Sequence, residues 1–269
     1  MAIGVLVVEI AAFVASDAPG IPGFSTQTDV AFAAKVDGST QRYVEMLPSK
    51  FRKNRRHDLM IAFHGHGSDR WQFVRDQRDE CRAARDVAVK HDMIFISPDY
   101  RSKTSWMGPK AESDVVQIIH DLRAKHIIRK VFLVGASMGG ASVLTFAVLH
   151  PELVDGVCSE NGTANHVEYQ NFQDAIVESF GGTKQQVPEE YRKRSAELFP
   201  EKLTMPIAFT TGGKDAYVPP QSVLRLVEIL RCGGRKVLLI HREQGGHSTT
   251  YDDAVTAMEF VVREASAKR

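Results

Sequence analysis

A serine stands at the centre of a glycine-framed segment, residues 135–139, with the sequence Gly-Ala-Ser-Met-Gly. An apolar run rich in β-branched residues, 128–134, precedes this segment, and a helix-forming run, 141–149, follows it. A strand, a G-x-S-x-G turn and a helix together are typical of a nucleophile elbow, in which a sharp turn exposes the serine hydroxyl. The motif therefore predicts Ser137 as a nucleophile. The alternative is a glycine-rich turn that carries a serine by chance.

A serine hydroxyl is a weak nucleophile at neutral pH, so it needs a base, and the base needs an acid that orients it. In open α/β sheets the reacting groups gather beyond the carboxyl ends of the strands, which restricts the search to residues just after strands. Asp215 follows one expected strand and His247 follows the last one. The chain order Ser137, Asp215, His247 is the order of nucleophile, acid and base expected in this architecture.

Other side chains compete for the roles of acid and base. Glu160 also stands at a strand end, whereas Asp252 and Asp253 lie inside the last expected helix and are less well placed. His241, on the last strand, is the alternative base, although its side chain is expected in packing or in solvent. The joint placement of three suitable residue types at three strand ends favours the first set as a catalytic triad.

The segment 64–67, with the sequence His-Gly-His-Gly, follows an expected strand at 58–63. Glycines in such a loop let the backbone turn its N–H groups toward a substrate carbonyl, and the residue after the nucleophile supplies a second N–H. We therefore expect the N–H groups of His66 and Met138 to form an oxyanion hole.

A zinc site is the competing interpretation of the same loop. His64 and His66, followed by Asp69, are residue types that bind zinc. Their spacing is imperfect for zinc, no further histidine follows closely, and the serine turn would be left without a role. The sequence therefore predicts no metal and no other cofactor, and His64 is expected to pack between loops.

Two tryptophans, Trp71 and Trp106, fall in loops that flank the expected mouth of the site. Aromatic side chains in such places commonly line a pocket for an acyl group or a sugar. Packing of the same side chains against the core explains their positions equally well. Both tryptophans are candidate substrate contacts on this evidence.

Strands and helices alternate over most of the chain, which indicates a mostly parallel sheet covered by helices on both faces. Alternating residues at 28–36 and 42–47, around an Asp-Gly turn, predict an antiparallel hairpin at the N-terminal side of this sheet. Residues 161–200 interrupt the alternation and carry two short helical patterns. They predict a small helical cap insertion within a single domain of residues 1–269.

The remaining expected elements follow from the periodicity of apolar residues. The expected strands are 58–63, 93–97, 131–134, 153–159, 205–211 and 236–241, and the expected helices are 75–91, 109–126, 141–149, 221–231 and 251–265.

The composition is that of a globular protein, with 43% hydrophobic residues among 269 and a formal net charge of +1 at pH 7. Neither nucleic acid nor a membrane is an expected partner, because proteins that bind them carry strongly basic faces. Three cysteines give no disulfide framework and favour a reducing compartment such as the cytoplasm. Secretion stays open, because the apolar residues 1–14 partly resemble a signal segment, although Glu9 interrupts them. The sequence leaves the oligomeric state open.

The sequence resembles an α/β-hydrolase, and the residues that carry the resemblance are 64–67, 135–140, 212–215 and 245–247. Within that superfamily it is similar to the single-domain esterases related to the prolyl oligopeptidase catalytic domain and to the dienelactone hydrolases. The Met-Pro pair at 205–206 and the Val-Pro-Pro-Gln-Ser segment at 218–222 also resemble that group.

Two departures from these families narrow what the resemblance implies. Dienelactone hydrolases use a cysteine nucleophile, whereas this chain has Ser137, and the oligopeptidases carry an N-terminal propeller for which 269 residues leave no room. The resemblance implies a serine carboxylesterase that acts through an acyl-enzyme on a small-molecule or oligosaccharide ester. Acetyl and feruloyl esters of plant polysaccharides are the nearest analogy. A small serine peptidase or amidase with the same triad, and a non-catalytic binding protein that keeps the fold, are the alternatives.

Overall fold

The computed structural model describes residues 21–267, so the apolar segment 1–14 and the question of secretion attached to it lie outside the described residues. The strands are β1 (Phe24–Ala33), β2 (Thr40–Pro48), β3 (His57–Phe63), β4 (Ile94–Pro98), β5 (Ile128–Ala136), β6 (Gly156–Glu160), β7 (Ile207–Gly212) and β8 (Val237–Arg242). The helices are α1 (Gln72–Arg75), α2 (Asp79–Lys90), α3 (Pro109–Lys125), α4 (Met138–Leu149), α5 (Gln173–Phe180), α6 (Pro188–Lys193), α7 (Gln221–Cys232) and α8 (Tyr251–Ala267). Short 3-10 turns are η1 (Pro151–Leu153), η2 (Ala196–Leu198) and η3 (Pro200–Lys202).

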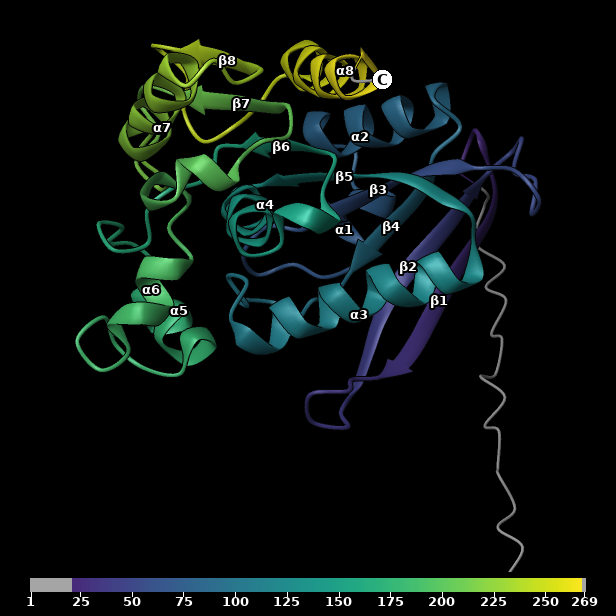
Figure 1. The fold of residues 1–269 in the computed structure, drawn as a ribbon, viewed down its shortest axis with the longest axis horizontal. Helices are drawn as coiled ribbons and strands as arrows, with labels where there is room; N and C mark the ends of the chain where they lie inside the picture. The colour runs from purple at the N-terminus through teal and green to yellow at the C-terminus, as the bar shows by residue number, and fades with distance from the viewer. Residues whose placement is uncertain (1–20, 268–269) are drawn as a thin grey trace, which may run out of the picture.

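Within residues 21–267 the strands form one eight-stranded sheet in the spatial order β1-β2-β4-β3-β5-β6-β7-β8 (Figure 1). Strand β2 pairs antiparallel with both β1 and β4, and the other pairings are parallel. This mixed sheet, with an antiparallel hairpin at one edge, confirms the fold class expected from the alternating pattern. All the parallel strands end at one edge of the sheet, which brings the segments that follow them together.

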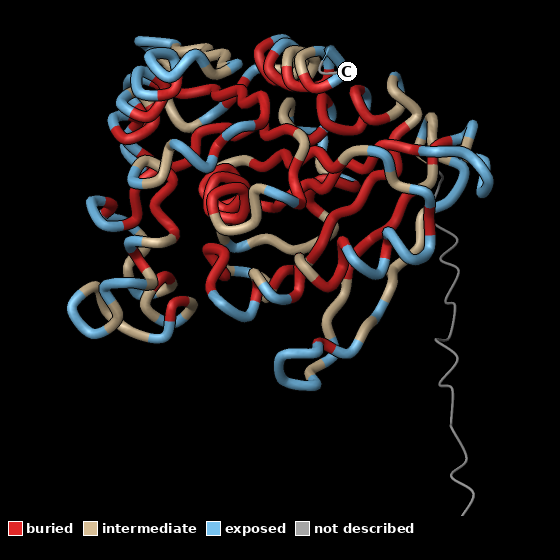
Figure 2. Tube along the Cα trace, in the orientation of Figure 1, coloured by how far each residue is buried: buried red, intermediate tan, exposed pale blue. Residues whose placement is uncertain are grey.

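Helices cover both faces of the sheet, because the central strands are apolar on both sides. Helices α2 and α8 pack on one face, and α3, α4 and α7 pack on the other (Figure 1). The buried apolar side chains accordingly form two clusters, one on each face. Figure 2 shows the central strands and α4 buried, with the exposed residues on the outer turns, edge strands and helix surfaces.

The edge hairpin starts earlier than its sequence pattern suggests. The expected first strand, 28–36, is instead β1 at Phe24–Ala33. The Ala34 N–H donates to the Ser39 carbonyl, and the Gly38 N–H donates to the Ala34 carbonyl, so the turn already begins at Ala34. Gly38 adopts a φ of 72°, a conformation that glycine tolerates, as the Asp-Gly turn predicted.

The cap segment, residues 161–200, holds α5, α6 and η2, and it lies beyond the N-terminal end of α3 (Figure 1). The second helical pattern of this segment starts at Pro188 and includes Tyr191 and Leu198, which predicts one helix, and this prediction is wrong. Helix α6 ends at Lys193, because Ser195 takes an extended backbone and its hydroxyl bonds back to the Tyr191 carbonyl at 2.7 Å. Leu198 falls in η2 instead.

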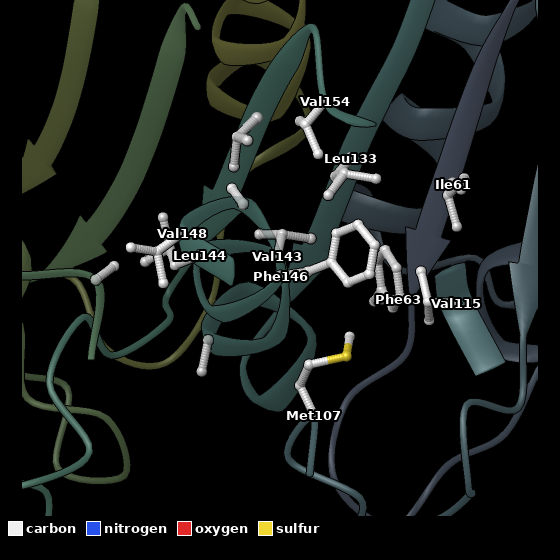
Figure 3. Packing of buried hydrophobic residues seen from close by; sticks show 14 of the residues in the cluster. Ile61, Phe63, Met107, Val115, Leu133, Val143, Leu144, Phe146, Val148 and Val154 are labelled. Carbon is white, nitrogen blue, oxygen red and sulfur yellow. The ribbon is translucent and has the colours of Figure 1, made fainter. Parts of the chain in front are cut away.

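Helix α4, directly behind the serine turn, is buried around nearly its whole circumference. A helix that is apolar on all sides belongs inside a protein, and its side chains fill the space between the sheet and the outer helices. Figure 3 shows Phe146 of α4 beside Phe63 of β3, with Leu133 of β5 nearby. The helix that carries the serine turn is therefore fixed by the core itself.

Within residues 21–267 no helix is both long enough and apolar enough to cross a bilayer.

Replacing Phe146 by alanine should lower the free energy of unfolding by about 3–5 kcal/mol, because the side chain is 0% exposed and its removal leaves a cavity. Urea unfolding measures the loss. Ile229→Ala, on the outer face of α7 with 43% of the side chain exposed, is the control and should change the free energy by about 0.5 kcal/mol or less. Equal losses in the two variants would contradict a core centred on α4.

Candidate active site

The turn between β5 and α4 holds Ser137 in an unusual backbone conformation, with φ 59° and ψ −120°. Side chains other than glycine rarely adopt a positive φ, and such strain persists only where the surroundings enforce it. The Ser137 N–H donates to the Glu160 carbonyl at 2.8 Å, and the Ala141 N–H donates to the Ser137 carbonyl at 3.0 Å. The two bonds fasten the serine between the neighbouring strand and its own helix.

The two glycines that frame Ser137 are required by close backbone packing. A Cβ on Gly135 would lie 2.5 Å from the Gly139 backbone, and a Cβ on Gly139 would lie 2.0 Å from the Phe63 carbonyl oxygen. Both distances are far inside van der Waals contact. The G-x-S-x-G pattern is therefore a packing requirement of a strand-turn-helix joint, and the chance alternative raised from the sequence does not explain it.

The structure brings Ser137, His247 and Asp215 together, although they lie far apart along the chain. The Nε2 atom of His247 is 2.8 Å from the Ser137 hydroxyl oxygen, and its Nδ1 atom is 2.6 Å from an Asp215 carboxylate oxygen. With Nδ1–H donated to the carboxylate, Nε2 is left as the acceptor for the serine proton. Ser137 is half-buried and 22% of the His247 side chain is exposed, so both remain within reach of solvent.

Asp215 is held in place from several directions. One of its carboxylate oxygens accepts the N–H groups of Tyr217 and Val218, at 3.0 and 2.9 Å. The side-chain amide of Asn161 donates to the other oxygen at 3.4 Å. The side-chain amide oxygen of Asn161 in turn accepts the Thr249 hydroxyl at 2.7 Å. These hydrogen bonds fix the orientation of the Asp215 side chain, so that the oxygen shared with Asn161 faces His247.

Glu160, the alternative acid, lies on another side of the sheet. Its carboxyl group points to the face covered by α2 and α8, 3.9 Å from the Cys158 sulfur, and one of its oxygens has no hydrogen-bond partner. Burial raises the pKa of Glu160 well above its usual range, and the nearby Glu80 adds to the shift. A neutral carboxyl group in this place cannot stabilise an imidazolium, and Glu160 instead contributes its backbone carbonyl to the Ser137 turn.

The other competing residues are engaged elsewhere. The Nδ1 atom of His241 lies 2.8 Å from the Thr211 hydroxyl. Asp253 forms an ion pair with Arg242 at 2.5 Å. Within residues 21–267, neither His241 nor Asp253 forms a hydrogen bond with a residue of the proposed triad.

The loop after β3 lies beside the nucleophile. A Cβ built on Gly65 would come within 3.8 Å of the Ser137 Cβ. The Gly65 N–H is already donated to the Gln72 side chain at 2.8 Å, so it is not available to a substrate. The Gly67 N–H is likewise donated, to the Lys103 carbonyl at 2.7 Å.

This leaves His66 as the loop's candidate donor. Within residues 21–267 neither the His66 N–H nor the Met138 N–H has a hydrogen-bond acceptor. Met138 is the first residue of α4, where backbone N–H groups lack partners within the helix. The pair stays a proposed oxyanion hole, and the structure places both groups on segments adjacent to Ser137.

Trp106, a candidate substrate contact from the sequence, does not line an open mouth. Its side chain is 0% exposed, and its indole N–H donates to Nδ1 of His66 at 3.2 Å. The cap segment covers it, with the rings of Tyr169 and Phe172 each 5.5 Å away. Trp106 therefore presents no surface to a substrate in this structure and instead orients the His66 ring, whose pKa burial lowers.

Trp71 remains a candidate substrate contact. It is half-buried immediately before α1, and the guanidinium of Arg75 lies 3.7 Å from the centre of its ring.

The zinc alternative requires free nitrogen lone pairs on His64. Its Nδ1 lies 2.9 Å from the Gly65 carbonyl oxygen and its Nε2 lies 3.1 Å from the Asp99 carbonyl oxygen, so the ring packs between loops as expected.

A buried polar cluster that the sequence analysis missed fastens the cap segment to the core. Arg194 of the cap segment is fully buried and donates to Glu112 of α3 at 2.6 Å. His166 lies 3.2 Å from the Thr145 hydroxyl of α4. Burial lowers the pKa of His166 to about 3, and the positive charges of Arg194 and Lys184 add to the effect. No motif marks these residues, since their roles depend on contacts between distant elements.

The sheet order, the serine turn and the site at the carboxyl edge define an α/β-hydrolase. A model of the prolyl oligopeptidase family matches residues 100–263, more than half of the sequence. The chain therefore belongs to the prolyl oligopeptidase family, and it is by class a serine hydrolase of the α/β-hydrolase type. A comparison with curated proteins gives no match.

Solved structures of low sequence identity share the fold. An S-formylglutathione hydrolase from Agrobacterium tumefaciens is 14% identical with a TM-score of 0.70, covering 93% of this chain and 98% of its own. A ferulic acid esterase is 16% identical with a TM-score of 0.67, covering 88% and 98%. A Bacteroides ovatus protein assigned as a dipeptidyl aminopeptidase IV is 15% identical with a TM-score of 0.70, covering 91% of this chain. The chain spans only 36% of that protein's length.

Asp215→Asn should lower kcat by about 10³- to 10⁴-fold, because the amide no longer holds His247 in the tautomer that accepts the serine proton. Glu160→Gln is the matched control, since the amide has the shape of a neutral carboxyl group and should leave kcat within about tenfold of wild type. Steady-state kinetics on one ester substrate compares the two. The reverse ranking would make Glu160 the acid.

Replacing His166 by glutamine should make the fold less sensitive to acid. Because the folded-state pKa of His166 lies below its ordinary 6.5, the unfolded chain takes up the proton first, and stability falls as the pH drops below 6.5. Between pH 7 and pH 4 this side chain alone should remove about 3 kcal/mol from the wild type.

Urea unfolding at several pH values measures the difference between wild type and His166→Gln. The exposed His120 offers the control, since His120→Gln should follow the wild type throughout. The wild type and His166→Gln should differ in free energy of unfolding by an amount that changes with pH. A difference that stays constant across the pH range would show that His166 does not stay neutral in the folded protein.

Proposed function

We propose that this chain is a serine carboxylesterase that works through an acyl-enzyme. The hydrogen-bonded series from Ser137 through His247 to Asp215 carries the proposal, because it joins a nucleophile, a base and an orienting acid at one edge of the sheet. The strained serine turn supports it, since backbone strain of this kind is concentrated at sites of function.

In the first step, Nε2 of His247 takes the proton of the Ser137 hydroxyl while the serine oxygen attacks the ester carbonyl carbon. Asp215 stabilises the imidazolium that forms. The carbonyl oxygen gains negative charge in the tetrahedral intermediate and accepts the N–H groups of His66 and Met138. The intermediate then expels the alcohol, which leaves with the proton from Nε2 of His247.

In the second step, water replaces the alcohol. Nε2 of His247 removes a proton from the water while the water oxygen attacks the acyl-serine carbonyl carbon. The second tetrahedral intermediate collapses, the carboxylic acid leaves, and Ser137 recovers its proton from His247. Both steps use groups that the described residues supply.

The ester is preferred over the amide as the substrate class on two grounds. The chain spans nearly the whole length of two structures whose names denote a hydrolase of S-formylglutathione and an esterase of ferulic acid. The nucleophile and the base are partly open to solvent, which suits a small ester. Acetyl and feruloyl esters of plant polysaccharides are the substrates that the sequence resemblance proposes. The family name and the Bacteroides ovatus structure favour the second candidate, a small serine peptidase or amidase.

Ser137→Ala should reduce the hydrolysis of p-nitrophenyl acetate by at least about 10³-fold in kcat, because it removes the hydroxyl that lies 2.8 Å from Nε2 of His247 and forms the acyl-enzyme. Release of p-nitrophenolate measures the rate. Ser25→Ala, an exposed serine on β1, is the control and should retain the wild-type rate.

Two results would overturn the proposal in different ways. Unchanged hydrolysis by Ser137→Ala would remove the serine from the mechanism altogether. A higher kcat/KM on an aminoacyl p-nitroanilide than on the matching p-nitrophenyl ester, in wild type, would replace the esterase by the peptidase.

A further inference from the structure

Two aromatic side chains beside the proposed triad have no part in the mechanism. Tyr217, two residues after Asp215, is 61% exposed, the largest value among the large hydrophobic side chains recorded as exposed in residues 21–267. Its ring centre lies 5.5 Å from the ring centre of His247. Exposed apolar surface of this kind often marks a binding site, because covering it with another apolar group removes it from water. A substrate that binds next to His247 also lies next to this ring.

The second side chain is Phe172 of the cap segment. It is half-buried, and its ring centre lies 4.6 Å from that of His66, whose N–H is a proposed oxyanion donor. The backbone of Phe172 is left-handed, with φ 55° and ψ 27°, directly before α5. A bulky residue rarely adopts this conformation, so the fold holds the ring against His66 and Trp106 at a cost in strain.

Hydrogen bonds join the cap segment, which carries Phe172, to the loop that carries Tyr217. The side-chain amide of Asn171 donates to the Tyr217 carbonyl at 2.8 Å and to the Ala216 carbonyl at 3.0 Å. The Tyr169 hydroxyl also donates to the Tyr217 carbonyl, at 2.8 Å. The cap segment and the loop that carries Asp215 therefore form one rim, with Phe172 on the oxyanion side and Tyr217 on the histidine side.

We infer that Phe172 and Tyr217 form an aromatic rim that binds a planar aromatic ring of the ester, an inference that rests on the proposed function. A flat ring can stack on one of these side chains or meet it edge-on, and such pairs have centres 4.5–7 Å apart. A puckered ring of equal size buries similar area but gains less from the aromatic faces. The ring belongs either to the acyl group or to the alcohol of the substrate. Each possibility is tested with its own pair of esters.

The test uses two pairs of esters in which a planar ring is matched by a saturated one. Methyl 3-phenylpropanoate against methyl 3-cyclohexylpropanoate places the ring in the acyl group. Benzyl acetate against cyclohexylmethyl acetate places it in the alcohol. Each variant is compared with wild type on the same substrate, so that the intrinsic reactivity of the ester cancels from the ratio.

Tyr217→Leu and Phe172→Leu should each lower kcat/KM about 3- to 10-fold on the planar ester of one pair, mainly through KM. On the saturated partner the loss should be about twofold or less. Tyr217→Phe should keep the wild-type value, because the ring and not the hydroxyl makes the contact. Phe199→Leu, a partly buried aromatic elsewhere in the cap segment, is the control and should not discriminate between the members of a pair.

The pair that responds identifies the acyl group or the alcohol as the source of the ring. Equal losses on planar and saturated esters, or no loss on either pair, would overturn the aromatic rim while leaving the esterase intact. Wild-type hydrolysis of p-nitrophenyl acetate but of none of the four esters would likewise overturn the rim and leave the esterase, whereas hydrolysis of none of the five esters would defeat the proposed function itself.

Discussion

The position of Ser137 depends on a close backbone contact at the turn between β5 and α4. Gly139 lies so near the Phe63 carbonyl that no side chain fits between them. That approach joins the serine turn to the end of β3, and the loop after β3 supplies the facing wall of the site. Because the turn is fixed by packing, Ser137 keeps a conformation that an isolated chain would leave.

Two buried carboxyl groups lie near this turn, and their surroundings give them different roles. Asp215 receives two backbone N–H groups and the imidazole of His247, which suits a carboxylate. Glu160 lies in apolar surroundings, where burial raises its pKa and favours the neutral acid. The acid that the site can use is therefore set by the hydrogen-bond donors around it, and proximity to the strand ends alone does not decide it.

The sequence predicted the fold class and brought Ser137, Asp215 and His247 into consideration, because parallel strands that end at one edge leave few positions for reactive groups. It favoured Asp215 as the acid and left Glu160 as the alternative, since the alternation along β6 that turns Glu160 to the other face shows only once the register is known. It left Trp106 open between a substrate contact and a residue packed on the core, and the structure shows that the cap segment buries this side chain. Contacts made by the cap segment depend on its tertiary position, which no local pattern records.

The most direct test of this account is a crystal structure of the protein after reaction with a fluorophosphonate ester, which forms a phosphonyl-serine that stands in for the tetrahedral intermediate. The account predicts a covalent bond from phosphorus to the Ser137 oxygen, with the phosphonyl oxygen about 2.7–3.1 Å from the backbone nitrogens of His66 and Met138. A phosphonyl group on another residue, or a phosphonyl oxygen turned away from both nitrogens, would contradict it.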